Sequence, residues 1–295
     1  MKHTIFKGAA VALITPFNAD GSINYEEFGK IIDDQIKGGT DALVVCGTTG
    51  EPSTMPDEEH IEAMKFAVDY TKKRIPVIAG TGSNDTEYCI ELSEKAEKMG
   101  ADALLLVTPY YNKCTQKGLK LHYESVAKKV DLPMILYSVK SRTGVNIAPE
   151  TLAELSKIDN IVAVKEASGD ISQVAKIASL CGDRLDIYSG NDDQIIPILS
   201  LGGVGVISVL SNVAPRLTHD MVMDYLEGNR EKALATQLSV IDLVDALFCE
   251  VNPIPVKTAM NLMGYNAGPL RLPLCEMEEK NLEILKAALK HHNLI

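Results

Sequence analysis

A repeat of short apolar segments, each followed by a turn and a helical pattern, is the feature that most constrains this chain. Eight such segments start at Ala9, Asp41, Ile75, Ala101, Leu132, Asn160, Leu185 and Gly203. They are almost continuously apolar, which is typical of parallel strands covered on both faces. Such a repeat fits a closed barrel or a doubly wound sheet. The count of eight, with no GxGxxG motif after the first segment, predicts an α/β fold of the (β/α)8 TIM-barrel type.

Helical patterns lie between these strands and after the last one. Residues 24–39 end in two glycines, residues 84–100 begin at a capping Asn84 or Asp85, and residues 148–158 carry Pro149 in the first turn. A further helix completes the barrel near Gly228. From Asn229 onward the pattern predicts helices over residues 230–248, 254–264 and 275–292. We therefore expect a barrel over residues 1–228 and a C-terminal helical region over residues 229–295.

The composition excludes several classes of function. The 295 residues include 40 acidic against 29 basic ones, which gives a formal net charge of −11. This balance argues against non-specific nucleic-acid binding and supplies no basic patch for a membrane surface. No stretch approaches the ~18 apolar residues of a membrane span. The apolar run from Gly8 to Ile14 follows Lys7 directly and is interpreted as the first strand, not as a signal peptide.

Cysteine and histidine spacing bears on metals and compartment. The six cysteines are scattered with no CxxC pair, which predicts reduced thiols in a cytoplasmic protein. The six histidines form no HxxxH or HExxH pair, so no catalytic metal is predicted and no cofactor is implied.

Lys165 ends the sixth predicted strand, in "VAVKEASGD". Lysine is seldom buried, and desolvation lowers its pKa from ~10.4 towards ~7–8, which frees the amine as a nucleophile. Alternatively, Lys165 extends its ammonium into solvent and stays charged. In a barrel, catalytic residues lie where strands end. The predicted fold therefore favours a buried stem with the amine facing a pocket.

Other strand ends supply groups that bind carboxylates. In "CGTTGE" two glycines bracket Thr48 and Thr49, so that backbone N–H groups and hydroxyls can surround a carboxylate. An ordinary turn with a helix cap remains the alternative. Arg142 follows the fifth strand, and its guanidinium can hold a carboxylate in a bidentate manner.

Tyrosines follow the fourth and fifth strands. Tyr110 and Tyr111 are adjacent, and neighbouring residues of an extended chain point in opposite directions. One ring can therefore face the site while the other faces an interface. Tyr137 ends the fifth strand, where its phenol can transfer protons. With the Lys165 amine, these groups are suited to Schiff-base chemistry on a 2-oxo acid.

The motifs "GTTGE", "TPYYNK", "SRTG", "VAVKEASGD", "SGND", "GVISV" and "NPIPVK" occur in this order along the chain. In them the chain resembles the dihydrodipicolinate synthase / N-acetylneuraminate lyase superfamily, and within it the synthases. The resemblance implies a lyase that condenses pyruvate with L-aspartate 4-semialdehyde to 4-hydroxy-tetrahydrodipicolinate, in lysine and diaminopimelate biosynthesis. The alternative within the superfamily is a sugar-acid or sialic-acid lyase.

The resemblance also implies roles for individual residues. Lys165 would form the Schiff base, and Tyr137 would transfer protons in a relay with Thr48 and Tyr111. Tyr111 would come from a neighbouring subunit of a homotetramer. Substrate-binding groups would be Thr49 for the pyruvate carboxylate, Arg142 for the second substrate, and Gly190 and Ile207 through their backbone.

Two departures from the synthase pattern concern the Arg142 loop and feedback by lysine. Ser138 and Lys140 replace the usual asparagine and proline, which predicts a less restrained loop. His60, Asn84 and Tyr110 match lysine-sensitive synthases. Their serine, histidine and glutamate are replaced by Pro52, Asp57 and Tyr88. We therefore predict weak or absent inhibition by lysine.

Overall fold

The computed structural model describes residues 4–295, and its core is a closed parallel barrel of eight strands in the order β1 to β8. This confirms the TIM barrel predicted from the repeat. The strands are β1 Gly8–Ala12, β2 Ala42–Val45, β3 Val77–Gly80, β4 Ala103–Val107, β5 Met134–Ser138, β6 Ile161–Glu166, β7 Asp186–Ser189 and β8 Gly205–Ser208. Seven of the eight lie within a predicted apolar segment, and β1 begins one residue before its segment, at Gly8.

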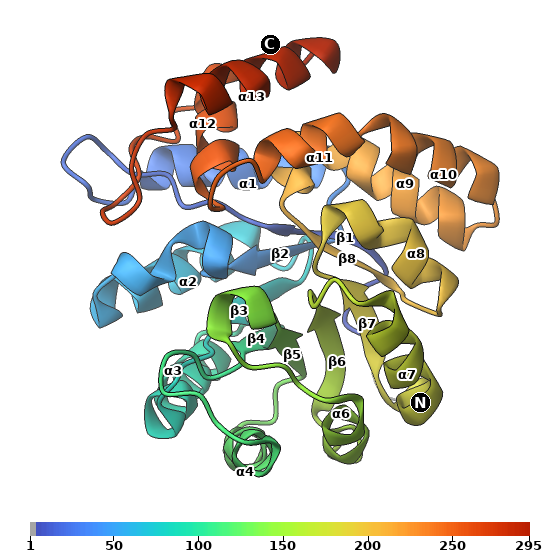
Figure 1. Ribbon diagram of the computed structural model, residues 1–295. Helices are drawn as coiled ribbons and strands as arrows, with labels where there is room; N and C mark the ends of the chain where they lie inside the picture. Colours follow the sequence, from blue (N-terminus) through green and yellow to red (C-terminus); the bar gives the residue numbers. More distant parts are fainter. Residues whose placement is uncertain (1–3) are drawn as a thin grey trace.

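Helices surround the barrel (Figure 1). They are α1 Tyr25–Lys37, α2 Asp57–Thr71, α3 Thr86–Lys98, α4 Gln116–Ala127, α5 Lys140–Thr143, α6 Pro149–Leu155, α7 Ile171–Cys181, α8 Ile195–Ser200 and α9 Pro215–Leu226. The predicted helix starts are confirmed, because Asn24 and Asp85 accept hydrogen bonds from first-turn N–H groups and Pro149 opens α6.

Two apolar clusters hold the barrel together. The larger lies between strands and helices and includes Phe28, Leu43 and Leu136. The smaller includes Val44, Ile135, Tyr137, Tyr188 and Ile207, the alternate residues of their strands. The polar residues that end β5 and β6 therefore lie above a tightly packed barrel interior.

The C-terminal helices are α10 Arg230–Ser239, α11 Ile241–Leu247, α12 Ile254–Leu262 and α13 Glu279–His291, coloured orange and red in Figure 1. A single helix over residues 230–248 was expected, and this expectation is wrong, because the chain breaks at the buried Val240. The break lets α10 contact α8 and α9 while α11 contacts α12 and α13. A division into two domains at residue 228 stays a prediction.

Within residues 4–295 no helix combines the length and apolar character that crossing a membrane requires. None of the six cysteines, all in the described part of the chain, is joined to another in a disulfide bond.

Candidate active site

Lys165 lies in β6, paired with Tyr137 of β5 on one side and Tyr188 of β7 on the other. Its side chain is buried, with 5% of the residue exposed. Burial lowers the pKa of the amine to about 7, Asp192 opposes this shift, and the charge of Arg142 adds to it. A substantial fraction of the amine is thus neutral near pH 7 and able to act as a nucleophile.

Tyr137 is the immediate neighbour of that amine. The Nζ atom of Lys165 lies 4.3 Å from the centroid of the Tyr137 ring. Burial raises the pKa of the phenol, while the Arg142 charge and a hydrogen bond with Thr48 oppose the rise. The phenol therefore stays protonated at neutral pH and can donate or return a proton above the amine.

A cavity of about 440 Å³ opens beside these residues. Thr48, Tyr110, Tyr137 and Arg142 line it, together with apolar groups from β4. Lys165 is not part of this lining, but the ring of Tyr137, which lines the cavity, lies beside its amine. The volume is in the range of small-molecule sites.

The threonine pair forms a single turn of 3-10 helix, Thr48–Gly50, directly after β2. Thr49 is 2% exposed, and its hydroxyl accepts a hydrogen bond from the Asn252 side-chain amide at 3.0 Å. Gly50 packs tightly there, because a Cβ atom would lie 3.2 Å from the carbonyl oxygen of Leu13. The hydroxyl of Thr49 keeps its own proton to donate to a carboxylate.

Arg142 belongs to α5 and is exposed at the mouth of the barrel. Its Nη2 atom donates to the backbone oxygen of Asn252 at 3.0 Å. Ser138 is buried and its hydroxyl accepts from the Ile147 N–H, while Lys140 is simply the first residue of α5. These bonds hold both ends of the loop, and a less restrained loop stays a prediction.

Gly190 and Ile207 complete the predicted set around Lys165. A Cβ atom on Gly190 would lie 3.2 Å from Cε of Lys165 and 2.8 Å from Cβ of Ala167, so only glycine leaves room for the lysine stem. Ile207 of β8 is fully buried in the inner cluster that also contains Tyr137. Neither residue lines the 440 Å³ cavity.

Tyr110 and Tyr111 separate as adjacent residues were expected to do. Tyr110 lines the cavity and is 40% exposed, whereas Tyr111 is 91% exposed and takes no part in the lining. Tyr111 also has a φ of 64°, a left-handed conformation that is strained for a residue other than glycine. Within one chain, the structure does not bring Tyr111 to Tyr137 and Thr48.

Sequence reasoning missed Asp192, which follows β7 in "SGND". Its carboxylate is 2% exposed and accepts hydrogen bonds from the N–H groups of Val209 at 3.0 Å and Leu210 at 2.9 Å. Burial raises the pKa of Asp192, and these bonds and the charge of Lys165 oppose the rise. Asp192 is thus a buried acid whose charge acts directly on the lysine.

Asn252 and the Lys257–Glu51 ion pair were also missed. Asn252 contacts Thr49 with its side chain and Arg142 with its backbone. Lys257 of α12 binds Glu51 at 2.7 Å, and both side chains are 1% exposed. Glu51 directly follows the threonine turn, so the C-terminal helices position that turn.

The comparisons with known proteins identify the family. The model of the Dihydrodipicolinate synthetase family matches residues 5–292. The chain belongs to the dihydrodipicolinate synthetase family. Among its relatives, the 4-hydroxy-tetrahydrodipicolinate synthase of Lachnoclostridium phytofermentans is 59% identical over 292 residues, 99% of either chain. The 4-hydroxy-tetrahydrodipicolinate synthase 1 of Clostridium acetobutylicum is also 59% identical over 292 residues, with 99% of either chain covered.

Solved structures of the dihydrodipicolinate synthetase family share the fold. The dihydrodipicolinate synthase of Thermotoga maritima has a TM-score of 0.96 and 42% identity, with 99% of this chain and 100% of that one covered. The synthase of Aquifex aeolicus has a TM-score of 0.96 and 44% identity, with 98% and 99% covered. These relatives carry synthase names, so the sugar-acid lyase alternative is not favoured.

Proposed function

We propose that this lyase condenses pyruvate with L-aspartate 4-semialdehyde to 4-hydroxy-tetrahydrodipicolinate through a Schiff base on Lys165. The observation that carries the proposal is the buried amine of Lys165, whose pKa is about 7, set beside the phenol of Tyr137. The synthase names of relatives at 59% identity support the choice of substrates.

The reaction begins when the neutral amine attacks the ketone carbon of pyruvate. Tyr137 supplies the proton with which the hydroxyl leaves as water, and an iminium forms on Lys165. Loss of a proton from the pyruvate methyl group gives an enamine. Thr49, with the backbone of its turn, holds the pyruvate carboxylate.

The enamine carbon then attacks the aldehyde carbon of the second substrate, and the new alkoxide takes a proton. Arg142 binds the carboxylate of that substrate at the mouth of the barrel. The amino group of the same substrate attacks the iminium carbon, closes the ring and releases Lys165 as a free amine. One water is released overall, and no electrons are gained or lost.

Tyr111 completes the relay with Thr48 and Tyr137 from a neighbouring subunit of a homotetramer. An aromatic ring that is 91% exposed on a strained backbone supports this assignment, because such strain is often found at functional sites. The cytoplasmic location expected from the sequence stays a prediction.

The test is borohydride reduction in the presence of pyruvate, followed by intact mass and peptide mapping. We expect one pyruvate-derived adduct per chain, on Lys165. Lys257 is the internal control, because it is equally buried but paired with Glu51, and it should stay unmodified. A folded protein that binds pyruvate without forming an adduct on Lys165 would rule out the Schiff-base mechanism.

A further inference from the structure

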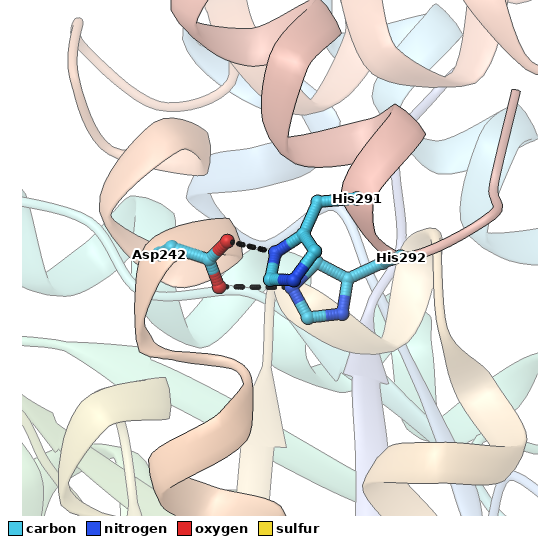
Figure 2. Close-up of side chains that lie close together, drawn as sticks. All are labelled: Asp242, His291 and His292. Atoms are coloured by element: carbon cyan, nitrogen blue, oxygen red, sulfur yellow. Dashed lines mark hydrogen bonds and ion pairs between the residues drawn. The ribbon is translucent and has the colours of Figure 1, made fainter.

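The C-terminal helices bring two histidines and an aspartate together, and none of the three is among the candidate-site residues described above. His291 ends α13 and His292 caps it, while Asp242 lies in the first turn of α11. Figure 2 shows both imidazole rings facing the single carboxylate. Nδ1 of His291 lies 2.7 Å from Oδ2 of Asp242, and Nε2 of His292 lies 2.8 Å from Oδ1.

These contacts bring potential metal-ligand atoms of the three residues close together. One ligand atom from each residue lies within 4.8 Å of the other two. Two imidazoles and a carboxylate are ligands that zinc prefers. Four-coordinate zinc with bonds of about 2.0–2.1 Å holds its ligand atoms about 3.3 Å apart. The ion would therefore fit if each N···O distance between a histidine and Asp242 lengthened by about half an ångström.

The protonation of the site is compatible with zinc. The carboxylate of Asp242 is 48% exposed, and an aspartate in contact with solvent is charged at neutral pH. A neutral imidazole can carry its proton on the ring nitrogen away from Asp242, which leaves a lone pair facing the ion.

We propose that Asp242, His291 and His292 bind a zinc ion, which ties the end of α13 to the start of α11. His292 is largely buried, with 14% of its side chain exposed, whereas Asp242 is 48% and His291 is 70% exposed. The ion therefore reaches the site from solvent and keeps water as its remaining ligand. Its role is structural, because within residues 4–295 the side-chain hydrogen bonds of the two histidines go to Asp242 and not to the groups around Lys165.

The test is zinc binding by the full chain at neutral pH, measured by competition with a chromogenic chelator. The exposed thiol of Cys275 is removed first by Cys275→Ser, because free thiols bind zinc on their own. We expect one equivalent of zinc, and at least about tenfold weaker binding in Asp242→Asn and in His291→Ala. Zinc should also raise the midpoint of thermal unfolding by a few degrees in the parent but not in these variants.

A second histidine–carboxylate pair supplies the matched control. Nδ1 of His219 lies 2.8 Å from Oδ2 of Asp41, but within residues 4–295 no third ligand joins this pair. His219→Gln should leave zinc binding unchanged. Failure to bind an equivalent of zinc, or binding that survives both Asp242→Asn and His291→Ala, would overturn the proposal and leave an ion pair alone.

Discussion

Tyr137 and Lys165 are register partners on adjacent parallel strands, and the amine nitrogen of one lies 4.3 Å from the ring centroid of the other. The pairing places a proton donor directly over a nucleophile without help from any flexible loop. Because both side chains rise from buried strands, their relative position is set by the sheet itself.

The pH dependence of the pyruvate step should follow Lys165. Its pKa of about 7 means that the ammonium form dominates at pH 6 and the neutral amine at pH 8. We expect kcat/KM for pyruvate to rise with pH through about 7. Tyr137→Phe should keep this profile while losing about 10²–10⁴-fold in rate, because proton transfer is impaired but the amine is not. A flat profile between pH 6 and 8 would contradict the assignment.

Asp192 should influence the pH at which kcat/KM for pyruvate rises. Its charge raises the pKa of Lys165, so Asp192→Asn should shift the rise in kcat/KM to lower pH. Asp193→Asn, the neighbouring exposed acid, is the control and should leave the profile unmoved. An unshifted profile in Asp192→Asn would mean that this carboxyl is protonated in the free enzyme.

The two buried lysines should respond oppositely to replacement by methionine. In Lys165 the folded pKa of about 7 lies below the unfolded value of ~10.4, so the unfolded chain binds more protons and stability rises with pH across that interval. We expect Lys165→Met to abolish the adduct and to raise the free energy of unfolding at pH 7 by roughly 2–4 kcal/mol.

Lys257→Met is the comparison. It leaves Glu51 buried without its partner, so a loss of about 3–5 kcal/mol is expected. Urea unfolding at pH 7 measures both changes. Destabilisation by both variants would show that desolvation of Lys165 is not a cost to the fold.

Arg142 should matter for the second substrate more than for the first. We expect Arg142→Ala to lower kcat/KM for L-aspartate semialdehyde by about 10–100-fold, as loss of a charged hydrogen bond predicts, while the pyruvate adduct still forms. Lys140→Ala tests whether any nearby cation can bind the second substrate, and it should change kcat/KM for that substrate little. Steady-state kinetics with either substrate varied separates the two cases; equal losses for both substrates would argue against the role.

Lysine should inhibit weakly or not at all. At the positions of a histidine and the glutamate of lysine-sensitive synthases, Asp57 accepts a hydrogen bond from the phenol of Tyr88 at 2.7 Å. The carboxylate there is already engaged, and Pro52 offers no hydroxyl. An activity titration with L-lysine checks this, and strong inhibition below millimolar concentration would refute it.

Local pattern predicted the strands and singled out Lys165 as a candidate nucleophile, for a physical reason. A strand buried on both faces is a continuous apolar run, so the polar residue that ends it, such as Lys165, stands out. Helix caps such as Asp85 are equally local. The break at Val240 was missed because α10 and α11 are turned by contacts with different partners, not by a helix-breaking residue.

Groups brought together over long separations in sequence could not be found in this way. Asn252 meets Thr49 across 203 residues, and Lys257 meets Glu51 across 206. Asp192 gives no local signal in "SGND", because the N–H groups that bind its carboxylate belong to Val209 and Leu210, which follow the next strand. Adjacent histidines match no metal spacing, and their aspartate lies 49 residues from His291.

Asn252 contacts the groups assigned to both substrates, through its amide on Thr49 and its carbonyl on Arg142. A shift of this residue would displace the anchor for the first substrate and the clamp for the second together. New acceptor aldehydes are therefore best sought, in engineering or in natural divergence, by changing the Arg142 side chain while Asn252 is retained. Retaining Asn252 keeps Thr49 in place to bind pyruvate, while a new side chain at position 142 changes which aldehyde is condensed with it.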